Sequence, residues 1–111
     1  MDKLDRYRQF IRDILIQHSK IPYKYGEIKF ETVFDRESDR YLLMILGREN
    51  KQYQHGCLIH LDIIDGKIWI QRDGTEIGVA NELVEAGVPK QEIVLGFKSP
   101  ERRKDTEFAI A

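Results

Sequence analysis

The side chains that most often carry chemistry are few in this sequence and far apart along it. His18, His55 and His60 are expected on a helix, in a loop and on a strand, and only His60 has an acidic neighbour, Asp62, on the same strand face. Two ligands are too few for a metal ion. Cys57, the single cysteine, begins a strand among apolar residues, where a thiol usually packs as a small hydrophobic group. The residue types therefore predict no catalytic residue, no cofactor and no metal.

One catalytic alternative stays open at this stage. An acidic residue precedes a lysine by two positions at Glu27 and Lys29 and again at Asp65 and Lys67, and Asp62 lies nearby in the sequence. A metal-dependent nuclease needs carboxylates that converge on one or two cations, often with a lysine beside the attacking water. Asp62, Asp65 and Lys67 could form such a set. Solvated charges in a turn and a loop are the simpler interpretation, since 33% of the chain is charged.

Two groups of side chains could instead bind a partner. The first shares one face of a predicted hairpin and consists of His60, Asp62, Trp69 and Gln71. A tryptophan beside polar groups on an exposed sheet is a good anchor for a protein partner, unless the C-terminal residues or a helix cover it. The second group is basic and consists of Lys98, Arg102, Arg103 and Lys104. It could make auxiliary contacts with the phosphate groups of DNA.

The overall charge limits how this chain could bind DNA. Its 111 residues carry 18 Lys and Arg against 19 Asp and Glu, which gives a formal net charge of -1. This balance excludes a strongly basic domain that binds DNA mainly by neutralising phosphates. The length is that of one domain, which we expect to span residues 1–111. A charged N-terminus and the lack of a long apolar run lead us to expect a cytoplasmic protein.

The first half of the chain predicts a helix followed by strands. Apolar residues recur at steps of three and four over residues 2–20, which indicates an amphipathic helix, and a loop is expected at 23–26. Residues 28–34 alternate as a half-buried strand does. The apolar run at 41–46 predicts a central strand covered on both faces, and the polar residues 47–56 predict a long connection.

The strongest local signal is the hairpin that would hold the first binding group. Two β-rich runs flank Asp65-Gly66, a pair that accepts the positive φ angles of a tight type I′ turn. The predicted cross-strand pairs are Ile64 with Lys67, Ile63 with Ile68, Asp62 with Trp69, Leu61 with Ile70 and His60 with Gln71.

The C-terminal third predicts short helices. A helix is expected over 74–86, begun by Asp73 and Glu76 at capping-box spacing, and helical turns are expected over 89–95 and from Ser99. The predicted fold class is therefore α+β, with an N-terminal helix, a four-stranded and mainly antiparallel sheet, and C-terminal helices.

Longer stretches of the sequence resemble one family. The run IHLDIIDGKIWIQRDGTEIGVANELVEAGVPKQEIVLGF, from Ile59 to Phe97, with the following SPERRKDTEFAIA, closely resembles the XisI proteins, the fdxN element excision controlling factors. The opening DKLDRYRQFIRDIL, the IPY after the first helix and the segment FDRESDRYLLM are similar to that family too. Three positions depart from the family pattern, because Arg48, Lys98 and Asp105 stand where Trp, His and Tyr are expected. They lie in expected loops and the tail, so they bear on partner choice more than on fold.

The resemblance implies a cyanobacterial controlling factor without catalysis of its own. The family role is control of the programmed excision of a DNA element during heterocyst differentiation, alongside a recombinase and a second factor, XisH. We therefore expect an XisH-like protein as the direct partner, an indirect association with DNA and the recombinase, and no membrane association. An inhibitor of a nuclease-like partner is a further alternative. An edge of so small a sheet could also pair in a homo-oligomer.

Overall fold

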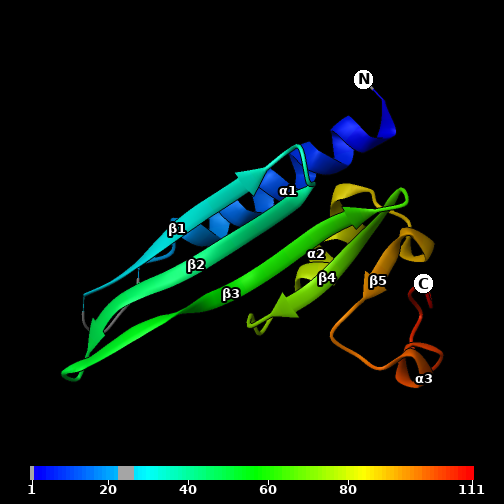
Figure 1. Ribbon diagram of the computed structural model, residues 1–111. Helices are drawn as coiled ribbons and strands as arrows, with labels where there is room; N and C mark the ends of the chain where they lie inside the picture. Colours follow the sequence, from blue (N-terminus) through cyan, green and yellow to red (C-terminus); the bar gives the residue numbers. More distant parts are fainter. Residues whose placement is uncertain (1, 23–26) are drawn as a thin grey trace.

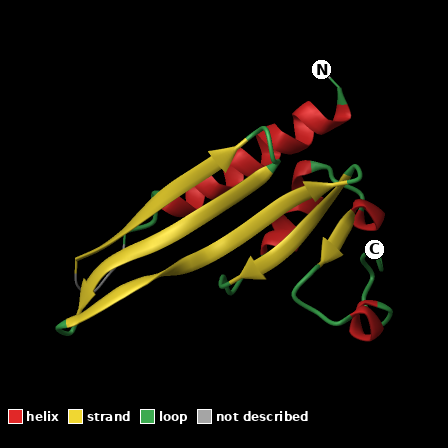
Figure 2. Cartoon of the chain, in the orientation of Figure 1, coloured by secondary structure: helices red, strands yellow, loops and turns green. Residues whose placement is uncertain are grey.

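The computed structural model describes residues 2–22 and 27–111, and the predicted loop at 23–26 lies outside this part of the chain. A five-stranded sheet with the spatial order β1-β2-β3-β4-β5 carries two longer helices on one face (Figures 1 and 2). In chain order the elements are α1 (Lys3–Ser19), β1 (Glu27–Asp35), β2 (Arg40–Glu49), β3 (Gln52–Ile64), β4 (Lys67–Asp73), α2 (Val79–Ala86), the 3-10 turn η1 (Lys90–Glu92), β5 (Ile93–Leu95) and α3 (Pro100–Arg103). This arrangement confirms the α+β class.

Helix α1 forms where the helical period predicted it. The Asp2 carboxylate caps its start by accepting a 2.8 Å hydrogen bond from the backbone N–H of Asp5. Its buried stripe packs on the sheet and consists of Tyr7, Ile11, Ile14 and Leu15. Burying these four large side chains is the main stabilising contribution of this helix, since most helical stability in proteins comes from the packing of an amphipathic face.

Strands β2 and β3 form one long hairpin, so the predicted polar connection at 47–56 is wrong. Asn50 and Lys51 form its tip with φ angles of 53° and 69°, the positive values of a type I′ turn. The pairing therefore continues to Glu49 and Gln52. This segment is polar because its strands extend past the helices into solvent (Figure 1). Composition alone does not distinguish such solvent-exposed strands from a loop.

Strand β2 lies between β1 and β3 and is covered by helices on one face, which corrects the prediction of a central strand with both faces covered. Tyr41 and Leu43 are buried against the helices, whereas Leu42 and Met44 are only half-buried. Successive side chains of a strand point to opposite faces, so Leu42 and Met44 lie on the face away from α1 and α2. An apolar run thus belongs here to a strand with one open face.

The β3–β4 hairpin has the predicted turn and most of the predicted register. Asp65 and Gly66 have φ angles of 51° and 79°, and the four pairs from Ile64 with Lys67 to Leu61 with Ile70 are as expected. The fifth pair is wrong, because His60 lies opposite Arg72 and not Gln71. A register shift between His60 and Leu61 inserts one extra residue into β4, as a β-bulge does.

The C-terminal third differs most from the prediction. Residues 93–95, predicted as part of a helical stretch, form β5, a fifth strand that pairs in parallel with β4 and buries all three of its side chains. Helix α2 begins at Val79, later than predicted, since the Asp73 carboxylate accepts hydrogen bonds from the N–H groups of Thr75 (2.9 Å) and Val79 (2.8 Å) and holds the intervening residues in a turn. None of the helices in the described residues is long and apolar enough to cross a membrane.

Candidate partner-binding face

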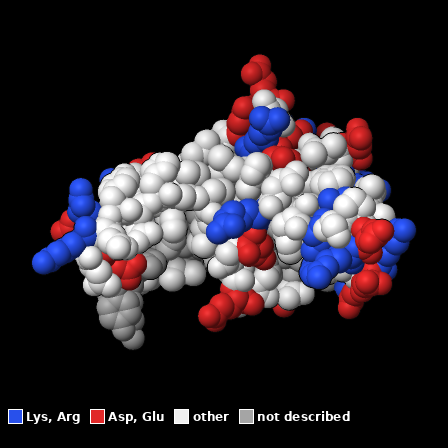
Figure 3. Space-filling model, turned by 60° about the horizontal axis from the view of Figure 1, so that its bottom comes forward, with Lys and Arg blue, Asp and Glu red and all other residues white. Residues whose placement is uncertain are grey.

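The face of the sheet away from α1 and α2 carries a row of apolar side chains that no described helix of more than one turn covers. We call it the open face, and its central residues are Leu42, Met44, Leu46, Cys57, His60 and Trp69. All six are half-buried. Figure 3 shows a broad area without Lys, Arg, Asp or Glu side chains between the charged groups at the left end of the molecule and those near its middle. A row of partly exposed apolar side chains on the open side of a sheet is a candidate site for binding another protein.

The first predicted group assembles on this face. Asp62 is buried at 8% exposure, and its Oδ1 lies 2.9 Å from His60 Nε2 while Gln71 Nε2 donates a hydrogen bond of 3.3 Å to its Oδ2. Trp69 lies directly across from Asp62 on β4. The four side chains therefore share one face as predicted, and the carboxylate fixes His60 and Gln71 beside the indole. Whether they contact a partner stays a prediction.

Trp69 is half-buried because part of its surface is covered from the C-terminal segment. The guanidinium carbon of Arg103 lies 5.1 Å from the centre of the indole ring. Gly96 approaches from the same segment, and a Cβ there would lie 3.2 Å from a carbon of the indole. Sequence reasoning considered the last four residues and α2 as covers and missed Arg103, whose pairing with Trp69 is set by the β4–β5 contact.

The predicted basic group is divided by the fold. Arg103 is occupied, since its Nε donates to the carbonyls of Leu95 (3.2 Å) and Lys98 (3.0 Å) and its Nη2 donates to that of Gly96 (3.3 Å). Its role is to close the loop between β5 and α3. Arg102 and Lys104 are exposed, and their contact with phosphate groups stays a prediction.

The side chains required by the nuclease alternative do not converge. The Asp62 carboxylate is occupied by His60 and Gln71, Asp65 forms the hairpin turn, and the Lys67 ammonium donates to the backbone carbonyl of the last residue. Within residues 2–22 and 27–111, no group of three or more His, Cys, Asp or Glu side chains could hold a metal ion. The geometry gives this alternative no support.

Cys57 has the surroundings of a packed thiol. Its Sγ donates to the carbonyl of Ile59 at 3.2 Å, and burial raises the pKa of the thiol. A raised pKa lowers the fraction of the reactive thiolate at neutral pH. The packing interpretation made from the sequence is consistent with this environment.

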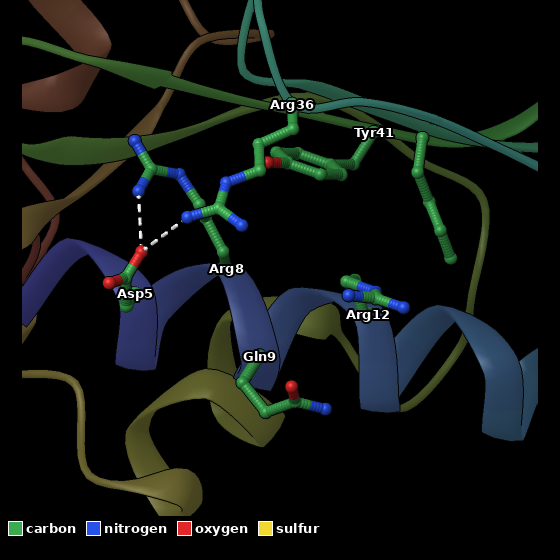
Figure 4. A pocket seen from close by; sticks show the side chains of 7 residues that line it. Asp5, Arg8, Gln9, Arg12, Arg36 and Tyr41 are labelled. Carbon is green, nitrogen blue, oxygen red and sulfur yellow. Dashed lines mark hydrogen bonds and ion pairs between the residues drawn. The ribbon is translucent and has the colours of Figure 1, made fainter. Parts of the chain in front are cut away.

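A second feature, missed from the sequence, is an arginine-lined hollow of about 460 Å³ between α1 and the β1–β2 turn (Figure 4). Arg8 donates to both Asp39 oxygens, from Nε at 2.8 Å and from Nη2 at 3.1 Å, and to Asp5 at 2.8 Å. Arg36 also donates to Asp5, at 3.0 Å, and the Tyr41 hydroxyl donates to Asp39, at 3.0 Å. Two carboxylates therefore neutralise two of the guanidinium groups, and we interpret the network as a brace that fixes α1 to the sheet.

The brace changes the titration of its members. The Arg8 guanidinium holds the pKa of the Asp39 carboxyl below its usual range. Burial, together with the hydrogen bond to Asp39, raises the pKa of Tyr41 to about 12. Charged Asp39 and neutral Tyr41 are thus the forms that the folded state favours.

Comparisons with known proteins were made for the sequence and for the fold. A family model described as XisI protein matches residues 1–110. A XisI-like protein from Anabaena variabilis has a similar crystal structure, with a TM-score of 0.86 and 33% identity over 97% of this chain and 99% of that one. The fdxN element excision controlling factor XisI from the same organism is also similar, with a TM-score of 0.81 and 35% identity over 99% of this chain and 100% of that one. No curated protein matches the chain.

Proposed function

Because this chain belongs to the XisI family, we propose that it controls the excision of a DNA element by binding a protein partner, without catalysis of its own. The observation that carries the proposal is the similarity, over 99% of the chain, to a protein described as an excision controlling factor. The apolar side chains at the centre of the open face support the same proposal, because such a surface suits a protein better than a nucleic acid.

The partner we propose is a protein of the XisH type, acting in the cytoplasm during heterocyst differentiation. DNA and the recombinase would then be reached through this partner. A chain with 18 basic and 19 acidic residues has little electrostatic attraction for duplex DNA, so a DNA-holding partner supplies what it lacks. Exposed Arg102 and Lys104 would add contacts to phosphate once the complex has formed.

The open face is the surface that we assign to this partner. Met44 lies at its centre, opposite Glu31 on β1 and Cys57 on β3. Half-buried Met and Leu side chains adapt to a facing surface and gain free energy when the remaining water is removed. Trp69 and His60 extend the face towards β4 and offer an aromatic ring and a polar group at its rim.

Co-expression with XisH-like proteins tests the proposal directly. We expect a tagged partner to co-purify this chain, and we expect the substitution Met44→Lys to weaken the complex at least tenfold by placing a charge in the middle of the open face. Ile77→Lys is the matched control, because Ile77 is 72% exposed next to α2 and its substitution should leave the complex intact. Trp69→Ala is less informative, since it also removes the surface on which Arg103 packs.

Two results would contradict the proposal. Equal effects of Met44→Lys and Ile77→Lys would remove the open face as the interface. Tight binding of the isolated chain to duplex DNA at physiological salt would contradict indirect association, since we expect little binding in an electrophoretic mobility shift or anisotropy titration. Circular dichroism of each variant should be used to check that its fold is retained.

A further inference from the structure

The hollow between α1 and the β1–β2 turn holds more positive than negative charge. Its guanidinium groups come from Arg8 and Arg12 on α1 and from Arg36 on the turn (Figure 4). The carboxylates that contact them belong to Asp5 and Asp39. Three cations against two anions leave one positive charge without a counterion among the residues that the structure describes.

The unmatched charge is that of Arg12. Arg8 uses all three of its nitrogens, since Nε and Nη2 donate to Asp39 and Nη1 donates to Asp5. Arg12 has no hydrogen bond or ion pair within the described part of the chain, and its guanidinium carbon lies 5.7 Å from the centre of the Phe34 ring. Like charges one helical turn apart destabilise a helix slightly, and no described carboxylate offsets the repulsion that Arg12 adds to Arg8.

Two arginines of the hollow keep donors for an incoming anion. A guanidinium that packs on an aromatic ring is held in one plane, and the N–H groups along its edge stay open to an acceptor. Phe34 holds Arg12 in this way. The Arg36 side chain is 74% exposed, and only its Nη2 is bonded, to Asp5 at 3.0 Å. The hollow therefore offers free N–H donors both from the helix and from the turn.

We propose that this hollow receives the carboxylate of a glutamate or aspartate in an acidic, partly apolar segment of another protein. This inference goes beyond the proposed function and does not rest on it. The carboxylate pairs with the planar fork of Arg12 and supplies the missing negative charge, while Arg36 adds a contact from the turn. The volume of about 460 Å³ exceeds that of one carboxylate side chain, so a neighbouring apolar side chain also fits, against Phe34.

The charges around the hollow favour a peptide carboxylate over the phosphates of a nucleic acid. Asp5 and Asp39 lie among the arginines. The turn beside them carries two further exposed acidic side chains, Asp35 and Glu37. A duplex presents a row of phosphates, and these carboxylates would repel the phosphates next to the one that is bound. A peptide places a single carboxylate at the arginines and an uncharged side chain beside it.

NMR of the arginine side chains tests the site directly. The probe is a pentapeptide with blocked ends and the sequence Ser-Glu-Phe-Glu-Ser, titrated into the ¹⁵N-labelled chain. We expect saturable shifts of the Nε–Hε signals of Arg12 and Arg36, and no such shifts with the peptide in which Gln replaces both Glu. Arg12→Gln should weaken binding at least tenfold, because it removes the bidentate charge-assisted pair. Arg6→Gln is the matched control, since Arg6 is exposed on the same helix and does not line the hollow.

Three outcomes would overturn the proposal. The first is the absence of a saturable shift of the Arg12 signal at about 10 mM peptide, where even a weak site is occupied. The second is equal weakening by Arg12→Gln and Arg6→Gln. The third is an equal or larger shift with inorganic phosphate or a short DNA duplex, which would make the hollow a phosphate site. Urea titration separates binding from folding, because Arg12→Gln leaves every hydrogen bond of the brace in place and should not lower the unfolding free energy.

Discussion

The contact between Arg103 and Trp69 allows the attachment of the C-terminal segment to be measured in isolation. Replacing Arg103 with Ala removes the donors that hold three backbone carbonyls of the β5–α3 loop and removes the cation above the indole. The substitution leaves the core beneath the sheet untouched, because Arg103 lies on the side of β4 away from Ile68 and Ile70.

The expected cost follows from two donor nitrogens, Nε and Nη2, which together hold the three carbonyls, and from one ring contact. Each hydrogen-bonding site contributes about 1 kcal/mol net, because water replaces part of it in the variant. A guanidinium packed on an indole contributes about 1 kcal/mol more. The unfolding free energy should therefore fall by about 3 kcal/mol, a large share of the roughly 5–15 kcal/mol typical of a domain.

Trp69 is the only tryptophan, so its fluorescence reports on this contact without labelling. Urea titration followed by fluorescence and by circular dichroism should give the lower stability, and the emission of the folded Arg103→Ala variant should shift to the red as the indole gains solvent. Arg103→Lys keeps the charge but loses the planar fork, and it should recover less than half of the loss. Arg102→Ala is the exposed neighbour and control, and an Arg103→Ala variant no less stable than this control would refute the reasoning.

Three further predictions concern the backbone and the brace at α1. Gly47→Ala should lower the unfolding free energy by more than about 3 kcal/mol in urea titrations, because Gly47 has a φ of 138° and a Cβ there would lie 1.9 Å from a β1 carbonyl oxygen. Gly56→Ala is the control: its Cβ would meet open space, and the substitution should cost less than about 1 kcal/mol. Tyr41 has a pKa raised to about 12, so its contribution is complete below pH 10 and is lost as the pH rises through 12; Tyr41→Phe should flatten this alkaline fall in thermal melts. Asp39 has a lowered pKa, so its contribution is present above its unfolded pKa of about 4 and is lost as the pH falls through the lower, folded value; Asp39→Asn should remove this part of the acid dependence while lowering stability at pH 7.

Local patterns in the sequence predicted those elements whose signals are also local. The period of α1 and the Asp65-Gly66 turn depend on residues a few positions apart, and both are as expected. The turn then fixes the pairs next to it, which is why Asp62 and Trp69 were placed opposite each other correctly. The prediction of a shared face for the first binding group rests on that pair.

The errors arise where tertiary contacts outweigh local preference. The bulge that displaces His60 from Gln71 leaves no mark in the composition of either strand. Residues 93–95 follow a proline and a 3-10 turn, and only the free edge of β4 makes them a strand. The brace of Arg8 and Asp39 joins residues 31 positions apart, a distance at which a single sequence gives no pairing signal.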